Sequence, residues 1–153
     1  MPIVWLKDRR DAYGKVAGWH HHQWGYLHPH RTIADVENEL SKYENIQELP
    51  LMWLYVSGTE VVGTVELCAD DMPTRTEFSP WLASLYADEG HREQGIGRVL
   101  AEHCIHEAKS RGFKELFLFT PDKEQFYLRL HFSVLERPIY HGHRVSIMRL
   151  SLE

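Results

Sequence analysis

Two glycines with one residue between them, Gly95 and Gly97, follow an apolar run and precede a long amphipathic segment. The preceding run, PWLASLYAD at residues 80–88, is typical of a strand, and the following segment has the period of a helix. A helix start presents free backbone N–H groups and the positive end of the helix dipole, so it binds anions. Glycine lets a phosphate approach the backbone, and Arg92 and Arg98 can add charge-assisted hydrogen bonds. The spacing therefore predicts a diphosphate site on this loop.

The two glycines alone also fit a purely structural turn. Gly-Ile-Gly arises wherever a loop turns tightly into a helix, with no ligand involved. The chain has no GxxxxGK[ST] motif for a nucleotide triphosphate, and no third glycine after an early strand for a dinucleotide. The pattern therefore favours a phosphate loop in the middle of the chain.

The elements expected around this loop alternate between strands and helices. Apolar periodicity predicts strands over residues 3–6, 49–56, 61–68, 80–88, 115–120, 133–140 and 144–152. It predicts helices over residues 11–25, 33–43 and 124–130, and a long one from Ile96 to a stop at Gly112. Thr32 and Asp35 resemble a capping box at the start of the second helix. The stretch 70–80 contains two prolines and is expected to be a loop within one domain. This order predicts a mixed sheet with helices on both faces.

Composition and charge narrow the class of protein. The 153 residues suit a single domain over 1–153, with 43% hydrophobic and 25% charged residues, the balance of a soluble globular chain. The net charge of -5 and the scattered basic residues argue against a nucleic-acid partner. No apolar run suits a membrane span or a signal peptide, so we expect a cytoplasmic protein without a membrane partner. Cys68 and Cys104 fall in an expected strand and helix, which favours reduced, buried thiols.

Two segments of the chain resemble the GNAT superfamily of acyl-CoA-dependent N-acetyltransferases. That family has a strand, then [RQ]xxGx[GA], then a helix, and SLYADEGHREQGIGRVL matches this signature in type and position. A second family segment, a strand, a short helix with FYxxxGF and another strand, is similar to LFLFTPDKEQFYLRLHFSVLERPIY. The resemblance runs from about Leu49 to the C-terminus. It implies an α/β (α+β) fold with a mixed, mostly antiparallel sheet of about seven strands, helices on both faces, and strands splayed at a central parallel pair.

The resemblance also implies roles for individual residues. The backbone of the strand before the loop would pair with the pantetheine arm of acetyl-CoA, the expected co-substrate, at Leu85, Tyr86 and Ala87. The pyrophosphate would lie on the loop amides of Arg92, Glu93, Gln94, Gly95, Ile96, Gly97 and Arg98. Tyr127 matches the tyrosine that contacts the cofactor and protonates the departing thiolate. Two positions depart from the family pattern: His131 replaces the glycine after the short helix, and Glu93 replaces a residue that is commonly glycine.

The implied reaction is transfer of an acetyl group to a primary amine of a small molecule or peptide, by direct attack in a ternary complex. Such a reaction needs a neutral amine, donors for the carbonyl oxygen and a proton for the thiolate. Glu66 and Glu77 are the candidate bases, and each also fits an ordinary solvated carboxylate. Tyr127 is the candidate acid, and it also fits a ring packed in the core. A non-catalytic acyl-CoA sensor, a transferase of another acyl group and a purely structural domain stay open as alternatives.

The first expected helices are unusually rich in aromatic and imidazole side chains, namely Trp19, His20, His21, His22, Trp24, His28 and His30. In the family that the chain resembles, this region builds the acceptor groove. A metal site needs convergent ligands, whereas adjacent histidines on a helix point about 100° apart. We therefore expect no metal, with the tryptophans on the core and some histidines lining a polar pocket. Asp70, Asp71 and Arg75 are candidates to orient a charged acceptor. The oligomeric state stays open, a homodimer included.

Overall fold

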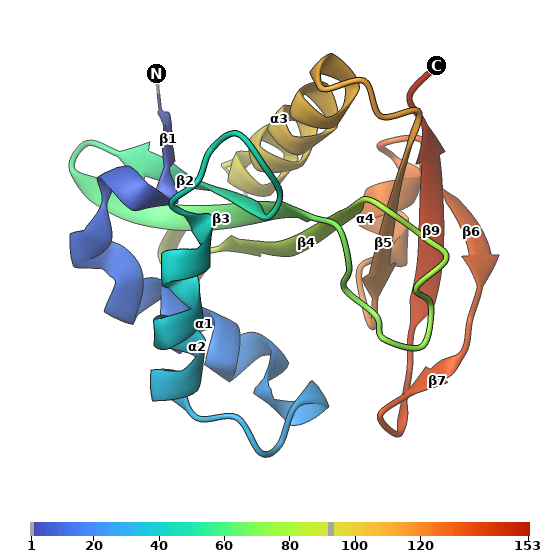
Figure 1. Ribbon diagram of the computed structural model, residues 1–153, viewed down its shortest axis with the longest axis horizontal. Coiled ribbons are helices and arrows are strands. Elements are labelled where there is room, and N and C mark those ends of the chain that lie inside the picture. Colours follow the sequence, from blue (N-terminus) through green and yellow to red (C-terminus); the bar gives the residue numbers. More distant parts are fainter. Residues whose placement is uncertain (1, 92–93) are drawn as a thin grey trace.

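The computed structural model describes residues 2–91 and 94–153 (Figure 1). Its strands are β1 (Ile3–Trp5), β2 (Leu51–Ser57), β3 (Glu60–Cys68), β4 (Trp81–Ala87), β5 (Glu115–Thr120), β6 (Ser133–Glu136), β7 (Ile139–Tyr140), β8 (His143–Arg144) and β9 (Ser146–Ser151). Its α-helices are α1 (Tyr13–Trp24), α2 (Ile33–Glu39), α3 (Ile96–Ser110) and α4 (Glu124–Leu128). Short 3-10 helices include η3 (Gly25–Leu27), η4 (Leu40–Tyr43) and η5 (Glu89–His91).

Seven strands form one mixed sheet in the order β1-β2-β3-β4-β5-β9-β6. Neighbouring strands pair antiparallel except β4 and β5, which run parallel. The parallel ladder holds a single pair, Trp81 with Phe117, beyond which the two strands diverge and divide the sheet into two halves (Figure 1). The predicted fold class, a mostly antiparallel sheet of about seven strands splayed at a central parallel pair, is confirmed.

The central strands are buried on both faces, which explains their continuous apolar runs. In β2, Leu51 and Trp53 join the core beneath α3, whereas Met52 and Leu54 join the core beneath α1 and α2. Figure 1 shows α3 on one side of this half of the sheet and α1 with α2 on the other. Tyr127 of α4 belongs to the same core as α3. Helices therefore cover both faces, as predicted.

The first two helices are short, and a local hydrogen-bonded cap marks the start of α2. α1 begins at Tyr13 rather than at residue 11, and α2 ends at Glu39, where the tighter turn η4 continues. The predicted capping box is present: the Asp35 N–H donates to Thr32 Oγ1 at 3.1 Å, and the Thr32 N–H donates to the Asp35 carboxylate at 2.9 Å. Within residues 2–91 and 94–153, no helix is both long enough and apolar enough to cross a membrane.

The C-terminal strands differ from the prediction. The two expected strands after α4 are each interrupted, at Arg137–Pro138 and at Val145. Proline has no N–H for the sheet ladder, which explains why β6 ends before it. β7 and β8 then form a separate hairpin, whose turn residues His141 and Gly142 have φ angles of 49° and 80°. Two positive φ angles in succession are typical of a tight two-residue hairpin turn.

Candidate active site

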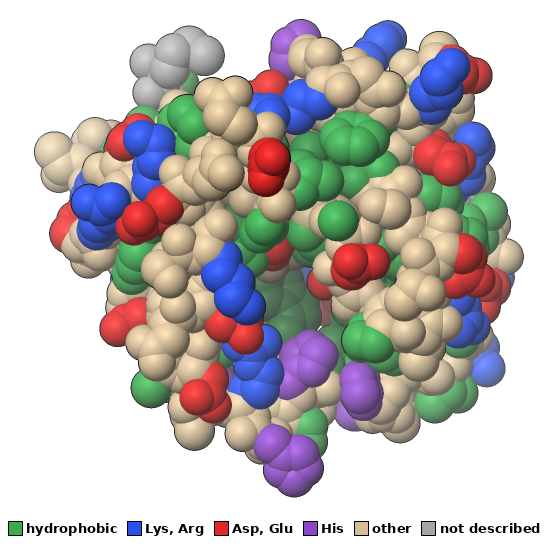
Figure 2. All heavy atoms as spheres, in the orientation of Figure 1, with side chains coloured by type: hydrophobic (Ala, Val, Ile, Leu, Met, Phe, Trp, Pro, Cys, Tyr) green, Lys and Arg blue, Asp and Glu red, His purple; other side chains and the backbone are tan. Residues whose placement is uncertain are grey.

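Two cavities lie on opposite faces of the sheet, where β4 and β5 diverge. The first, here called the polar cavity, has a volume of about 420 Å³ and is lined by α1, η3, α2, β4 and the segment after β5. The second, here called the α3 cavity, has a volume of about 650 Å³ and is lined by β4, the start of α3 and α4. Figure 2 shows the face that carries the polar cavity: it is hollowed at its centre, with apolar side chains at the bottom and histidines along one rim.

The α3 cavity contains the helix start where the sequence predicts the diphosphate site. Gly95 has a φ of 76°, a left-handed conformation that glycine adopts without strain, and a Cβ there would meet no neighbouring segment within 4 Å. No side chain of the described residues caps this helix. The first intrahelical hydrogen bond runs from the Val99 N–H to the Gly95 carbonyl, so the amides before it point out of the helix. This uncapped, open helix start fits an anion such as a pyrophosphate.

The structure brings most of the predicted cofactor residues to this cavity. The lining includes Leu85, Tyr86, Ala87, Gly95, Ile96, Gly97 and Arg98. The Arg98 guanidinium also pairs with Glu102 at 2.6 Å on the exposed side of α3. Gln94 is exposed and lies just before the first lining residue of the loop, whereas Arg92 and Glu93 fall outside the described residues.

The two cavities meet at the splay between β4 and β5. The residues that line both cavities are Gln23, Leu85, Asp122, Lys123 and Tyr127. Leu85 belongs to β4 and Tyr127 to α4, so both halves of the sheet contribute to this boundary. We call this boundary the junction.

Tyr127, the predicted acid, lies at the junction. It is only 6% exposed, and its ring packs edge-to-face against Phe126 and Phe132. Burial raises the pKa of its hydroxyl above the ordinary value, so the phenol stays protonated at neutral pH. The same side chain therefore belongs to the core and lines the junction.

Glu66, one of the two predicted bases, lines the polar cavity from β3 and is 8% exposed. Its carboxylate accepts hydrogen bonds from Tyr43 Oη at 2.5 Å and from Ser84 Oγ at 2.7 Å. Burial raises the pKa of Glu66, whereas the two hydroxyl donors favour the charged form and act in the opposite direction. A hydrogen-bonded carboxylate with a raised pKa is suited to accept a proton from an amine.

Glu77 and Arg75 lie away from this cavity. Glu77 is exposed in the loop between β3 and β4 and does not line the cavity. Arg75 Nη2 pairs with Glu136 Oε1 at 2.6 Å, which ties the loop to β6. Asp70 and Asp71 of the same loop do line the polar cavity. Of the two predicted bases, the structure therefore brings only Glu66 to the cavity.

β4 carries a strained residue beside Glu66. Ser84 has a φ of 53°, and the β3–β4 register shifts between Thr64 and Glu66, which marks a bulge. Thr64 Oγ1 donates a hydrogen bond to the Ser84 carbonyl at 2.7 Å. His20 Nε2 lies 3.0 Å from the same hydroxyl oxygen, and because the hydroxyl proton points to Ser84, we assign Nε2–H as the donor. Burial lowers the pKa of His20 to about 4, so this ring is neutral.

The histidine-rich segment contributes to the polar cavity as expected. His20, His21 and His28 line the cavity, whereas His22 and His30 are exposed. The three lining rings come from α1 and from the turn after η3, so they form one wall of the cavity.

The two tryptophans of α1 pack on β4. The rings of Trp19 and Trp24 lie 5.1 Å and 6.4 Å from the ring of Tyr86. These contacts fix α1 against the end of β4. The helix that carries His20 is therefore held in place relative to the junction.

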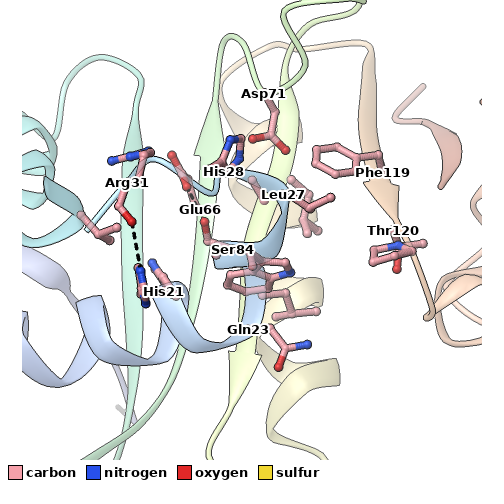
Figure 3. Close-up of a pocket in the computed structure, with 18 of the residues that line it drawn as sticks. His21, Gln23, Leu27, His28, Arg31, Glu66, Asp71, Ser84, Phe119 and Thr120 are labelled. Carbon is pink, nitrogen blue, oxygen red and sulfur yellow. Dashed lines mark hydrogen bonds between the residues drawn. The ribbon is translucent and has the colours of Figure 1, made fainter. Parts of the chain in front are cut away.

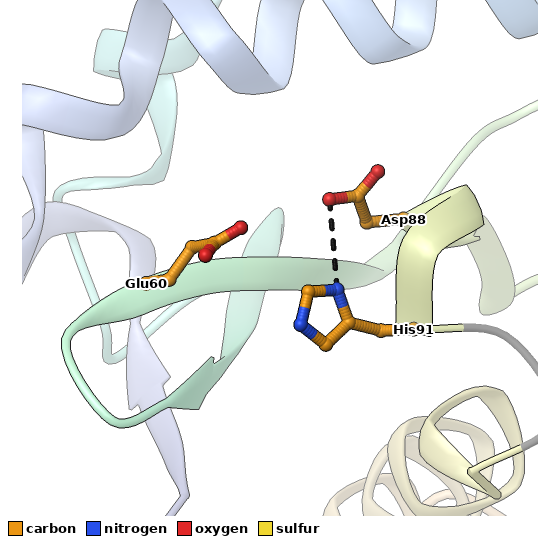
Figure 4. A group of neighbouring side chains, drawn as sticks. All are labelled: Glu60, Asp88 and His91. Carbon is orange, nitrogen blue, oxygen red and sulfur yellow. Dashed lines mark ion pairs between the residues drawn. The ribbon is translucent and has the colours of Figure 1, made fainter.

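One group of side chains with metal-ligating atoms lies elsewhere among the described residues. The ligand atoms of Glu60, Asp88 and His91 lie within 4.8 Å of one another, between the β2–β3 turn and η5 (Figure 4). Asp88 Oδ2 is 3.7 Å from His91 Nδ1, and Lys15 Nζ is 3.6 Å from Glu60 Oε1. Because the Lys15 ammonium already offsets part of the acidic charge, we interpret this cluster as a surface ion-pair network.

His131 stands where the resembling family has glycine. Its φ is 74°, so this histidine adopts the left-handed conformation that glycine adopts without strain. The Phe132 N–H donates to the Tyr127 carbonyl at 3.1 Å and closes the end of α4. The turn into β6 is therefore kept, and the exposed His131 does not line the α3 cavity.

Sequence reasoning missed the residues that hold Glu66 and the bulge in place: Tyr43, Thr64 and Ser84. Tyr43 resembled one more apolar position of a helix face. A signal was present at Thr64 and Glu66, because both interrupt the apolar run VVGTVELC. Polar side chains inside a strand that is buried on both faces need hydrogen-bond partners, and those partners mark the site.

Comparisons with known proteins agree with this geometry. The model of the acetyltransferase (GNAT) family matches residues 14–132. Human N-acetyltransferase 8B is 37% identical over 68 residues, a match that spans 44% of this chain and 30% of that protein. An aminoglycoside 6'-N-acetyltransferase complexed with coenzyme A has a TM-score of 0.77 at 16% identity, covering 100% of this chain and 98% of that one. The protein yncA of Salmonella typhimurium, with its cofactor acetyl-CoA, has a TM-score of 0.73 at 19% identity, covering 99% and 93%. Because the family match includes most of its residues, this chain belongs to the GNAT acetyltransferase family.

Proposed function

We propose that this chain is an N-acetyltransferase that moves an acetyl group from acetyl-CoA to a primary amine. The observation that carries the proposal is the meeting of the two cavities at Leu85 and Tyr127. One cavity offers helix-start amides for an anionic carrier, and the other offers the buried carboxylate of Glu66. A transfer with both substrates bound at once needs separate entrances and a shared boundary, since the reacting atoms must be held in contact.

Acetyl-CoA is the proposed carrier. Two proteins of similar fold are solved with CoA or acetyl-CoA. In this chain, the N–H groups of Ile96, Gly97 and Arg98 would hold the pyrophosphate, because α3 is uncapped and Gly95 leaves the approach open. Residues 92–94 extend the same loop, and their assignment rests on the sequence motif. Residues 85–87 line the path from this anion site to the junction.

Acetyl-CoA supplies a thioester whose acetyl carbon is open to attack by a neutral amine. The C–N bond forms as the C–S bond breaks, the electron pair of the broken bond leaves with sulfur, and the amine releases one proton. We assign Glu66 to accept this proton and pass it to solvent, since Glu66 is the buried carboxylate whose hydrogen bonds reach Ser84 beside the junction.

Tyr127 acts on the departing sulfur in this proposal. Its hydroxyl donates a hydrogen bond as negative charge develops there, because it lies at the junction and stays protonated. Burial raises the pKa of Tyr127, so its hydroxyl keeps the proton until negative charge develops on the sulfur. Tyr127 is therefore the proposed acid: it gives its proton to the departing thiolate and regains a proton from solvent.

A thiol-release assay tests the proposal. Purified protein with acetyl-CoA and a panel of primary amines should release CoA only when both substrates are present, with the N-acetylated amine identified by mass spectrometry. Glu66→Gln keeps the shape of the side chain and removes the base, so we expect kcat to fall about 100-fold with the CoA affinity unchanged.

The alternatives give different outcomes in the same assay. Binding of acetyl-CoA with no thiol release in the presence of any amine contradicts the enzyme and favours a sensor. Release with succinyl-CoA but not with acetyl-CoA assigns a different acyl group. Failure of CoA to bind at all contradicts both readings and favours a structural domain.

A further inference from the structure

Acidic side chains outnumber basic ones among the described residues that line the polar cavity. Its carboxyl groups come from Glu39, Glu66, Asp70, Asp71 and Asp122, and its cationic side chains are Arg31 and Lys123. Arg31 Nη2 is already paired with Glu39 Oε2 at 2.7 Å. Within residues 2–91 and 94–153, no ion pair involves Glu66 or Asp71. The cavity therefore has an excess of acidic groups on the side of β3.

Two of the three histidines of the cavity wall, His20 and His28, do not add positive charge to the cavity. Burial lowers the pKa of His20 to about 4, and its ring donates to Thr64 as a neutral group. Burial also lowers the pKa of His28, with the neighbouring His141 and Arg31 acting in the same direction. Both rings are neutral at neutral pH, so these two side chains offer hydrogen-bonding groups without charge.

Among the described residues, Asp71 is the cavity acid that is not fully exposed and has neither a hydrogen-bond donor nor a cationic partner. Figure 3 shows it pointing into the cavity between His28 and Phe119. No described group donates a hydrogen bond to it, whereas Glu66 receives two. Burial and the negative charge of Glu66 both raise the pKa of Asp71 well above its ordinary value. Asp71 is half-buried beside another acid, and no described residue gives it a hydrogen-bond donor or a cation. An ammonium group can supply both, through a charge-assisted hydrogen bond.

Asp71 lies farther from the junction than Glu66 does. Along the β3–β4 ladder, Glu66 pairs with Ala83 and Cys68 with Trp81, so β3 moves away from Leu85 as it approaches residue 71. Figure 3 shows the same order, with Ser84 between Gln23, which lines both cavities, and Asp71. An acceptor whose reacting amine lies beside Glu66 would extend its other end toward Asp71.

We propose that Asp71 binds a second cationic group of the acceptor, so that the preferred substrates are diamines or polyamines rather than monoamines. This inference rests on the proposed function, because it assumes that the reacting amine lies at the Glu66 end of the cavity. The reacting amine is neutral, and the distant one is an ammonium that pairs with Asp71. Asp71 keeps its proton in the free protein, and it releases this proton to solvent when the ammonium group pairs with it.

Paired amines of equal length test this inference. The α,ω-diamines from diaminopropane to diaminohexane are compared with the matching alkylamines and amino alcohols at constant ionic strength, by CoA release and by thermal stabilisation of the CoA complex. We expect one diamine length to exceed its matched monoamine in kcat/KM about 10- to 100-fold, as for a hydrogen bond between charged groups. Asp71→Asn should abolish this preference, by lowering kcat/KM for the diamine much more than kcat/KM for the matched monoamine. The exposed neighbour Asp70 supplies the matched control, Asp70→Asn, which should keep the preference.

The outcomes separate this inference from the proposed function. Equal use of monoamines and of every diamine, or a diamine preference that survives in Asp71→Asn, overturns the inference and leaves the acetyltransferase intact. If no amine supports CoA release but a diamine selectively stabilises the wild-type complex and not Asp71→Asn, the cation site stands and the catalytic proposal fails. If neither turnover nor stabilisation favours a diamine, the inference is overturned. The wild-type comparison decides the matter even if Asp71→Asn does not fold.

Discussion

Tyr127 combines two features in one side chain, because its ring packs in the core and the side chain also lines the junction. Tyr127→Phe keeps the ring and removes only the hydroxyl. We expect kcat to fall by about 10- to 100-fold, since a donor to developing charge is lost, while the dissociation constant of CoA changes less than about twofold. Single-turnover kinetics with isothermal titration of CoA measure the two quantities separately. If folded Tyr127→Phe has an unchanged kcat, a group other than the Tyr127 hydroxyl stabilises the departing sulfur.

Asp71 also makes a prediction about stability. Its folded pKa is raised, so as pH rises past the ordinary aspartate value of about 3.9 the unfolded chain releases a proton that the folded chain keeps. The folded state then binds more protons than the unfolded state, and the free energy of unfolding falls with rising pH. Asp71→Asn should therefore raise Tm at pH 7 by a few degrees, at about 2–4 °C per kcal/mol, and have little effect near pH 3.

The control for this stability prediction is Asp70→Asn, because Asp70 is exposed in the same loop. It should show no comparable gain at pH 7. A lower Tm for Asp71→Asn at pH 7 would mean that the folded protein already stabilises the charged form of Asp71. If Asp71→Asn is more stable and also loses diamine selectivity, Asp71 is a binding group that lowers the stability of the free protein.

At the scale of the elements, the start of α3 is the proposed anion site. Gly95→Glu places a like charge at that start, and we expect CoA affinity to fall more than about 100-fold. Gly112 is the matched control: it lies just past the other end of α3, has a φ of 89°, and is as open as Gly95. Gly112→Glu should carry a similar backbone strain, yet it should bind CoA normally.

Thermal unfolding and CoA titration of both glycine variants provide the measurement. A glutamate near a helix N-terminus is favourable to the helix dipole, whereas one near the C-terminus is unfavourable. Gly95→Glu should therefore be no less stable than Gly112→Glu. Equal CoA affinities in the two variants would contradict the placement of the pyrophosphate at α3.

The bulge in β4 depends on a second element, α1, through the hydrogen bonds from His20 to Thr64 and from Thr64 to Ser84. Thr64→Val keeps the shape but removes the hydroxyl, which leaves His20 Nε2–H and the Ser84 carbonyl without this partner. We expect a loss of about 1–3 kcal/mol in stability and a roughly tenfold lower kcat, with CoA affinity kept. Thr64→Ser should restore both values, and a crystal structure of Thr64→Val should show Ser84 leaving its φ of 53°. Full activity of Thr64→Val would show that the bulge holds without this hydroxyl.

The elements themselves were largely predictable from the sequence, because their signals are local. The capping box at Thr32, the glycine-opened helix α3 and the apolar runs of β2 and β3 each depend on neighbouring residues only. The interruption of the last strands was missed, although Pro138 marked it. Periodicity alone does not show where a strand leaves one sheet and turns into a separate hairpin.

At the scale of the whole molecule, one divergence of β4 from β5 creates two entrances and a shared boundary. The sequence predicted the α3 cavity, since its loop motif is contiguous. Glu66 and Asp71 of the polar cavity were candidates from the sequence, whereas Tyr43 and Phe119 were not, because only the tertiary fold brings η4 and β5 to the same cavity. Glu66 and Glu77 were equal candidates for the base on the sequence. Only their tertiary placement separates the exposed loop carboxylate of Glu77 from the buried carboxylate of Glu66.

A crystal structure of the chain with bound acetyl-CoA tests the central claim most directly. We predict pyrophosphate oxygens within hydrogen-bond distance of the backbone N–H groups of residues 96–98, and a thioester between β4 and β5 that contacts Leu85 and Tyr127. Phosphates bound away from the start of α3, or an acetyl group that does not reach the junction, would contradict the account.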